Sequence, residues 1–286
     1  MKIAACVILY HPKEKDLHNI LSYLPHVDRL YVYDNTENAE TILPFEDNDK
    51  VLYVSDNQNK GLSVRLNYAC NLALEEGFDF LLTMDQDSYF IPENFKQYLI
   101  NIQEYALLHE VGSFGLDYST EAKVVQPAKV VPQETNLLIT SGSVLNLRNY
   151  QEIGGFDEKL FIDGVDYDFS FSTMKAGYKN IIFKNNYFNH SFGEKTKVAS
   201  IKTLFLIKKE KQLHSPIRIY YIKRNLLYLQ DKFGDVFPEL VQKMSKRYAS
   251  QIESNLLYSR KFFPILKFIS KAKKDFKAGK MGKIEL

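Results

Sequence analysis

Residues 78–88 have the sequence Phe78-Asp-Phe-Leu-Leu-Thr-Met-Asp85-Gln86-Asp87-Ser88, an apolar run that ends in two carboxylates. The run predicts a buried strand from Phe78 to Met84. Two carboxylates just past such a strand cost repulsion and desolvation unless a cation compensates them. Mg²⁺ or Mn²⁺ prefers oxygen ligands and couples carboxylates to phosphates, which favours a nucleoside diphosphate as ligand. The alternative is a loop whose Asp and Ser side chains only cap the helix beginning near Pro92.

Strands and helices alternate in the residues that precede this run. Apolar segments predict strands at residues 3–10, 30–33 and 51–54, and apolar residues at helical spacing predict helices over 14–24 and from about 61 to 74. This alternation indicates a parallel α/β sheet, which binds ligands beyond the carboxyl ends of its strands. Asp34 and Asp85 both stand at such ends.

The pattern changes after residue 110. Short stretches with β-branched residues at 123–126, 129–131 and 137–140 predict an antiparallel extension of the sheet, and 181–183 predicts one more strand. From about residue 202 the chain is predominantly helical. We therefore expect an α/β fold with a Rossmann-like, mostly parallel central sheet, an antiparallel extension and a helical C-terminal region. The expected domains are residues 1–200 and 201–286.

An acidic segment and a small-residue turn are further candidates for chemistry. Asp163 and Asp166 stand among bulky apolar residues, which could raise a carboxylate pKa toward that of a general base. They could equally favour the dipole at the start of a helix. Thr140-Ser-Gly-Ser143 follows a predicted strand and could let a ligand approach the backbone, or could simply be a turn.

Three basic or imidazole side chains complete the list of candidates. His190 is either a metal ligand or a hydrogen-bonded structural residue. Arg218 and Arg224 could neutralise a diphosphate leaving group, although a solvated helix face explains them nearly as well.

Composition limits the class of partner. The 286 residues carry 37 basic and 35 acidic side chains, a net charge of +2 that argues against a nucleic-acid binder. Two cysteines in apolar contexts favour a reducing compartment. The chain shows neither a secretory signal nor an uninterrupted apolar run long enough for a membrane span. We expect a cytoplasmic protein, soluble or peripheral at the inner face of the cell membrane.

Charge is unevenly distributed along the chain. Residues 246–286 hold 11 Lys/Arg against three Asp/Glu, whereas residues 1–245 carry a balance of −6. Apolar residues from Phe262 to Phe276 recur at helical steps with lysines between them. This is typical of a basic amphipathic helix on an anionic membrane. The alternative is a terminal helix packed on the catalytic domain or on a homodimer partner.

Taken together, the motifs resemble the family-2 inverting glycosyltransferases with the GT-A fold, and within them the bacterial rhamnosyltransferase branch. The resemblance covers about four-fifths of the chain. The matching pieces occur in family order: Leu9-Tyr10-His11-Pro12, Tyr33-Asp34-Asn35, Asn57 to Leu62 with Asn67, Met84 to Ser88, Ile139 to Ser143, Gly154 to Asp166, Lys175 to Tyr178, and His214 to Asn225.

The resemblance implies an enzyme that moves a sugar, with rhamnose as a candidate, from a nucleoside-diphosphate donor to a glycan or lipid-linked acceptor in surface polysaccharide synthesis. It implies donor binding by the matching residues Tyr10, Asp34, Asn57, Gly61, Asn67, Asp85, Arg218 and Arg224, with Asp34 at the base and Asp85 at the ribose or metal. It also implies that Asp87, Asp85 and His190 hold Mn²⁺ or Mg²⁺.

The catalytic base implied by the resemblance is Asp166 or Asp163. Many relatives have Glu-Asp-x-Asp where this chain has Asp163-Gly-Val-Asp166, and Asp166 is the first choice because it keeps the Val-Asp pair. The chain also lacks the Trp that usually follows in this branch. Two other functions stay open: a nucleotidyltransferase, whose usual Gly-rich phosphate loop is absent after the first strand, and a catalytically silent nucleotide-binding, glycan-binding or membrane-attached subunit.

Overall fold

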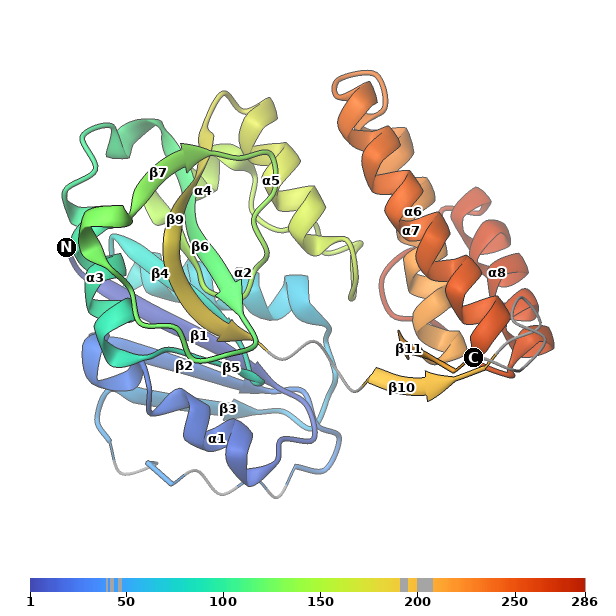
Figure 1. The fold of residues 1–286 in the computed structure, drawn as a ribbon, viewed down its shortest axis with the longest axis horizontal. Helices are drawn as coiled ribbons and strands as arrows, with labels where there is room; N and C mark the ends of the chain where they lie inside the picture. Colours follow the sequence, from blue (N-terminus) through green and yellow to red (C-terminus); the bar gives the residue numbers. More distant parts are fainter. Residues whose placement is uncertain (40, 42–43, 46–47, 191–194, 200–207, 286) are drawn as a thin grey trace. The chain divides into compact units, whose positions relative to one another are not determined.

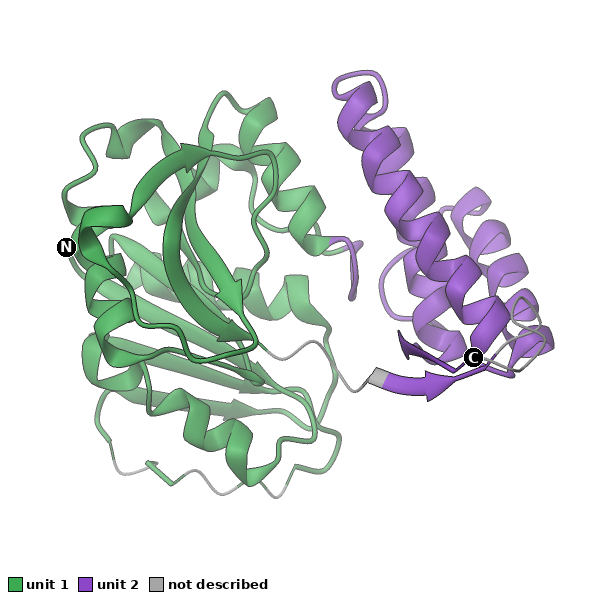
Figure 2. Ribbon diagram, in the orientation of Figure 1, with its two compact units in different colours: residues 1–158, 165–191 green, residues 159–164, 192–286 purple. Residues whose placement is uncertain are grey.

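The computed structural model describes residues 1–39, 41, 44–45, 48–190, 195–199 and 208–285 (Figure 1). It divides into two compact units (Figure 2). Unit 1 comprises residues 1–158 and 165–191, and unit 2 comprises residues 159–164 and 192–286. The predicted boundary between residues 200 and 201 lies outside the described residues.

Unit 1 is built on a nine-stranded sheet with the order β3-β2-β1-β4-β8-β6-β9-β5, and β7 also pairs with β9. Strands β3, β2, β1 and β4 are mutually parallel, and β8 runs antiparallel to β4. The predicted mostly parallel sheet with an antiparallel extension is confirmed. The strands are β1 (Ile3–Leu9), β2 (Arg29–Asp34), β3 (Val51–Ser55), β4 (Phe80–Asp85), β5 (Ser88–Tyr89), β6 (Val111–Ser119), β7 (Val131–Glu134), β8 (Ser143–Asn146) and β9 (Lys179–His190).

Of the three short strands predicted in the extension, two are wrong, and the third, at 129–131, shares only Val131 with β7. Residues 123–126 and 137–140 are not strands, because side chains rather than a neighbouring strand satisfy their backbone. The Asn94 amide accepts from the Val125 N–H and donates to the Lys123 carbonyl. The Leu138 N–H donates to the Ser170 hydroxyl. Antiparallel pairing comes instead from β5, β7 and β8.

The helices of unit 1 are α1 (Glu14–Ile20), α2 (Leu62–Glu75), α3 (Pro92–Gln103), α4 (Leu147–Ile153) and α5 (Val165–Lys175), with short 3₁₀ turns at Leu24–His26, Leu108–Glu110 and Pro127–Lys129. Pro92 at the first turn of α3 suits a helix start, since its missing N–H would be unpaired there. Gly154 ends α4 in the left-handed conformation that favours glycine.

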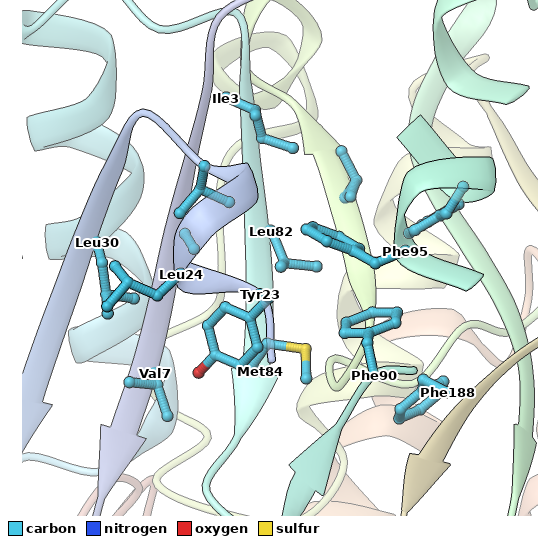
Figure 3. Close-up of a cluster of buried hydrophobic side chains, with 14 of the residues drawn as sticks. Ile3, Val7, Tyr23, Leu24, Leu30, Leu82, Met84, Phe90, Phe95 and Phe188 are labelled. Carbon is cyan, nitrogen blue, oxygen red and sulfur yellow. The ribbon is translucent and has the colours of Figure 1, made fainter. Parts of the chain in front are cut away.

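Aromatic side chains form part of the hydrophobic core near the carboxyl end of β4 (Figure 3). The Phe90 ring centroid is 4.5 Å from that of Phe95 on α3 and 5.9 Å from that of Phe188 on β9. Met84, one residue before Asp85, belongs to the same cluster. Core packing therefore fixes the ends of β4, β5 and β9 relative to one another.

Unit 2 consists mainly of helices α6 (Pro216–Phe233), α7 (Pro238–Tyr258) and α8 (Phe262–Lys277), with a hairpin of β10 (Lys195–Val198) and β11 (Lys209–Gln212). The Ser215 hydroxyl caps α6 by accepting from the Arg218 N–H. The predicted helical C-terminal region is confirmed. No described helix is long and apolar enough to cross a membrane.

We expect Phe95→Ala to lower the free energy of unfolding by about 3–5 kcal/mol, because it leaves a cavity in the hydrophobic core. Ile100→Ala on the same helix is the control: Ile100 is 44% exposed, and its truncation should cost less than about 1 kcal/mol. Chemical denaturation followed by circular dichroism measures both. Equal losses would contradict a core centred on Phe95.

Candidate functional site

Three side chains that the sequence suggested as metal ligands meet at the carboxyl end of β4. Asp85 is the last residue of β4, Asp87 follows it in the turn, and His190 ends β9, where it pairs with Ser88 of β5. One ligand atom from each of Asp85, Asp87 and His190 lies within 4.8 Å of the others. The sheet therefore brings together carboxylates and an imidazole that are about a hundred residues apart.

His190 is held in a defined orientation. Its Nδ1 is 2.7 Å from the Ser88 Oγ and 3.7 Å from an Asp87 carboxylate oxygen. Burial lowers the His190 pKa, and the charges of Asp87 and Asp166 raise it to a smaller extent. A neutral imidazole beside two carboxylates is a donor set that fits a divalent cation.

The turn at residues 140–143 is the scaffold of this site. The Ser141 hydroxyl accepts from the Asp85 N–H at 3.1 Å and donates to the Ser88 Oγ at 2.9 Å. Gly142 has φ +75°, and a Cβ there would lie 3.0 Å from the Phe188 ring. Packing and the positive φ favour glycine at residue 142, and the hydroxyl of Ser141 holds Asp85 and Ser88, so the turn does more than reverse the chain.

Asp166 and Asp163 have different surroundings. Asp166 belongs to unit 1, where its Oδ1 accepts from the Thr140 N–H at 2.8 Å. Asp163 belongs to unit 2 and adopts φ +62°. Its carboxylate accepts from the Arg218 Nε and Nη2 at 3.1–3.3 Å. Asp163 is thus engaged by a cation, whereas Asp166 is tied to the turn that also holds Asp85.

Asp34 lies at the carboxyl end of β2 and is fully buried. It accepts hydrogen bonds from the Thr36 N–H at 2.8 Å, the Thr41 hydroxyl at 2.6 Å and the Tyr53 hydroxyl at 3.0 Å. Burial alone would raise the Asp34 pKa, but the hydrogen bonds outweigh it and lower the pKa below the usual value. Asp34 is therefore an ionised acceptor at neutral pH.

Arg65 on α2 is a residue that the sequence interpretation missed. Its side chain is 1% exposed, and its guanidinium donates to both Asp56 carboxylate oxygens, the Asn35 amide oxygen and the Gln58 carbonyl. It thereby braces the loop between β3 and α2 against the end of β2. The sequence feature that could have identified Arg65 as buried is its position beside Leu66, on the side of the helix that carries apolar residues.

The same loop contains two predicted donor-binding residues. Asn57 has φ +56°, and Gly61, with φ +81°, is the N-cap of α2. The Gly61 N–H donates to the Asn59 side chain, and its carbonyl accepts from Asn35. Backbone geometry thus explains these residue types without reference to a ligand.

Tyr10 and Asn67, both predicted to bind the donor, contact the chain's own groups. The Tyr10 N–H donates to the Gln86 side chain at 2.7 Å, and the Tyr10 side chain is 46% exposed. The Asn67 amide oxygen accepts from the Tyr150 hydroxyl and the Phe156 N–H. Tyr10 therefore offers an exposed ring next to the Asp85 turn, while Asn67 fastens α2 to the segment after α4.

Arg218 and Arg224 are both in unit 2 and differ in exposure. Arg224 is 1% exposed, stacks on Tyr220 and Tyr221, and donates to the Gly282 carbonyl at 2.7 Å. The Arg218 side chain is 46% exposed. Of the two arginines predicted to meet a diphosphate, only Arg218 presents its guanidinium at the surface of its unit.

Tyr118, which the sequence interpretation also missed, lies beside the carboxylate and imidazole cluster. It stands at the end of β6, its side chain is 50% exposed, and its ring centroid is 6.4 Å from that of His190. An exposed aromatic ring in this position is a surface on which a sugar ring can stack.

Comparisons with known proteins agree with this geometry. No protein-family model matches the chain. The chain is 25% identical over 249 residues, 80% of its own length and 80% of the relative's, to the dTDP-rhamnosyl transferase RfbF of Shigella flexneri.

Among solved structures, the chain is similar to GalNAc-T7 crystallised with UDP, GalNAc and Mn²⁺, with a TM-score of 0.62 and 12% identity over 97% of this chain. It is similar to S. aureus TarS, with a TM-score of 0.52 and 16% identity over 80% of this chain. The chain spans 56% of the length of the GalNAc-T7 chain and 40% of that of TarS.

The chain has the GT-A fold, as its structural likeness to these glycosyltransferases shows. The predicted resemblance to GT-A glycosyltransferases, and to a rhamnosyl transferase among them, is confirmed. Together the comparisons support a glycosyltransferase.

Asp56, in the loop between β3 and α2, makes the stability of the fold depend on pH in a way that can be tested. Burial alone would raise its pKa, but hydrogen bonds from Arg65 and Lys60 lower the pKa to about 2. An aspartate in an unfolded chain has a pKa of about 3.9. Asp56 therefore stabilises the fold fully above about pH 4, and this contribution is lost as the pH falls toward 2.

We expect the difference in unfolding free energy between wild type and Asp56→Asn to be constant above about pH 4 and to shrink below it. Denaturation curves at several pH values measure this difference. Glu75→Gln, an exposed carboxylate on α2, is the control for loss of one charge. A difference that grows on acidification would contradict the assignment.

Proposed function

We propose that the chain is a metal-dependent inverting glycosyltransferase that moves a sugar from a nucleoside-diphosphate donor to a glycan or lipid-linked acceptor in surface polysaccharide synthesis. The observation that carries the proposal is the convergence of Asp85, Asp87 and His190 at the carboxyl edge of a GT-A sheet. The likeness to a dTDP-rhamnosyl transferase favours rhamnose as the sugar and dTDP as its carrier.

Donor binding in this proposal uses groups at the carboxyl ends of β2 and β4. Ionised Asp34 is the proposed acceptor for the nucleotide base, and Asp85 contacts the ribose or the cation. Asn57, Gly61 and the neighbouring backbone flank the nucleotide.

The diphosphate is the most highly charged part of the donor. A divalent cation, Mn²⁺ or Mg²⁺, held by Asp87, Asp85 and His190 would supply positive charge to its oxygens. Mn²⁺ is the ion named with the structurally similar GalNAc-T7. Arg218, whose guanidinium is exposed, stays a predicted source of further positive charge, whereas Arg224 is buried and donates to the Gly282 carbonyl within its own unit.

Asp166 is the proposed base. It lies in the same unit as the cluster and is close enough to His190 to raise the pKa of that imidazole. The acceptor oxygen forms a bond to the anomeric carbon while Asp166 takes its proton. The bond from that carbon to the diphosphate breaks, and its electron pair leaves with the diphosphate. Attack from the face opposite the leaving group inverts the anomeric centre.

Asp87→Ala should lower metal-dependent nucleotide release by at least about 100-fold, because it removes a charged ligand from the cluster. The measurement is nucleotide release from a panel of nucleoside-diphosphate sugars that includes dTDP-rhamnose, with and without Mn²⁺. Glu93→Ala, an exposed carboxylate on α3, is the matched control.

Wild-type protein that releases nucleotide from no donor, yet folds, would favour the catalytically silent subunit. Full activity in Asp87→Ala would contradict the proposed role of a divalent cation.

Asp166→Asn should slow transfer by about 10²–10⁴-fold with the donor KM little changed. The asparagine keeps an oxygen that accepts from the Thr140 N–H, so the turn is preserved. Asp163→Asn is the comparison, and we expect it to retain more activity than Asp166→Asn. The reverse order, measured as kcat at saturating donor, would assign the base to Asp163.

A further inference from the structure

Helix α8 packs on its own unit through one face only. Ile265 and Ala272 are fully buried, and the helix packs against α6 and α7. Asp275 on this face accepts from the Tyr220 hydroxyl at 2.7 Å and pairs with Lys271 at 3.0 Å. The chain itself therefore covers the inner face of α8.

The opposite face leaves three large apolar side chains in solvent. Phe262 is 48% exposed, Phe263 is 80% exposed and Leu266 is 41% exposed. The two phenylalanine rings contact each other edge to face, with centroids 5.5 Å apart. This cluster is apolar surface that stays exposed after the chain has folded, which is typical of a surface that binds a partner.

Lysines continue the same face toward the end of the helix. Steps of three, four and seven residues place side chains on one side of a helix, so the apolar cluster and the lysines form one surface. We call it the α8 outer face: Phe262, Phe263, Leu266, Lys267, Lys273, Lys274 and Lys277, all of them exposed. Within the described part of the chain, no carboxylate is in ion-pairing distance of these four lysines.

We propose that the α8 outer face docks on an anionic lipid bilayer. The helix would lie in the plane of the membrane surface, with Phe262, Phe263 and Leu266 at the boundary of head groups and acyl chains and the lysines among anionic head groups. Charge favours this partner over a second copy, because an anionic surface neutralises the four lysines, whereas a second copy would bring the same positive charge to this face. If the proposed function also holds, docking brings the enzyme to the membrane where lipid-linked acceptors reside.

The test is flotation of the full-length protein with vesicles of phosphatidylcholine alone or with 30% phosphatidylglycerol. Wild type should float with the anionic vesicles and much less with the neutral ones. Replacing Lys267, Lys273, Lys274 and Lys277 with Gln should weaken binding by about 100-fold or more. Replacing Phe262 and Phe263 with Ser should weaken it by about tenfold or more.

Control variants change exposed side chains of unit 1, four lysines in one variant and one apolar side chain in the other. Lys15, Lys96, Lys123 and Lys129 replaced by Gln give the same net charge, and Val124→Ser removes a side chain that is 62% exposed. Both controls should bind as wild type does. Absence of flotation, equal binding to neutral vesicles or equal losses in the controls would overturn the proposal.

Light scattering on the same variants measures their oligomeric state and so tests whether the partner of this face is a second copy of the chain. A dimer that the Phe262 and Phe263 changes convert to monomer, with flotation unaffected, would assign this face to a second copy and overturn lipid docking. Nucleotide release by the variants in the absence of vesicles separates the two proposals. Wild-type protein that releases no nucleotide but binds vesicles through α8 would contradict the proposed enzymatic function and leave the lipid-docking proposal standing.

Discussion

The Ser141 hydroxyl is the group on which the geometry of the site depends. It accepts from the backbone of Asp85 and donates to Ser88, whose own hydroxyl contacts His190. Both serines are buried, so losing a partner would leave a polar group unsatisfied at a cost of about 1–3 kcal/mol. The candidate ligands therefore reach their positions only when the three segments of the chain that these hydrogen bonds join have folded together.

The aromatic core explains why this hydrogen-bond chain stays in register. Phe90 follows β5 directly, and Phe188 precedes His190 by two residues, so each ring anchors a strand end that carries a site residue. Gly142 has φ +75° and packs against the Phe188 ring, which a Cβ at 3.0 Å would force to shift. Apolar packing behind the sheet edge thus sets positions that the polar groups on the edge then refine.

A similar division holds for the charged groups. Buried Arg65 and Arg224 brace the backbone of their own units, whereas exposed Arg218 and the α8 lysines present charge at the surface. From sequence, all of these are basic residues on helices. Burial separates those that stabilise structure from those available to a ligand or a membrane.

The sequence by itself determined the strand and helix order as far as Asp85, the acidic end of that strand and the amphipathic character of the last helix, because these follow from local periodicity. Strands at 123–126 and 137–140 were predicted wrongly because side chains of Asn94 and Ser170, remote in sequence, took the place of a strand partner. The family resemblance implied that His190 joins Asp85 and Asp87, and the tertiary structure shows the three side chains meeting. Only the tertiary structure decided that Asp163 pairs with Arg218 while Asp166 binds the turn, and that α8 keeps one face exposed. Those outcomes depend on contacts between distant segments, which no local pattern encodes.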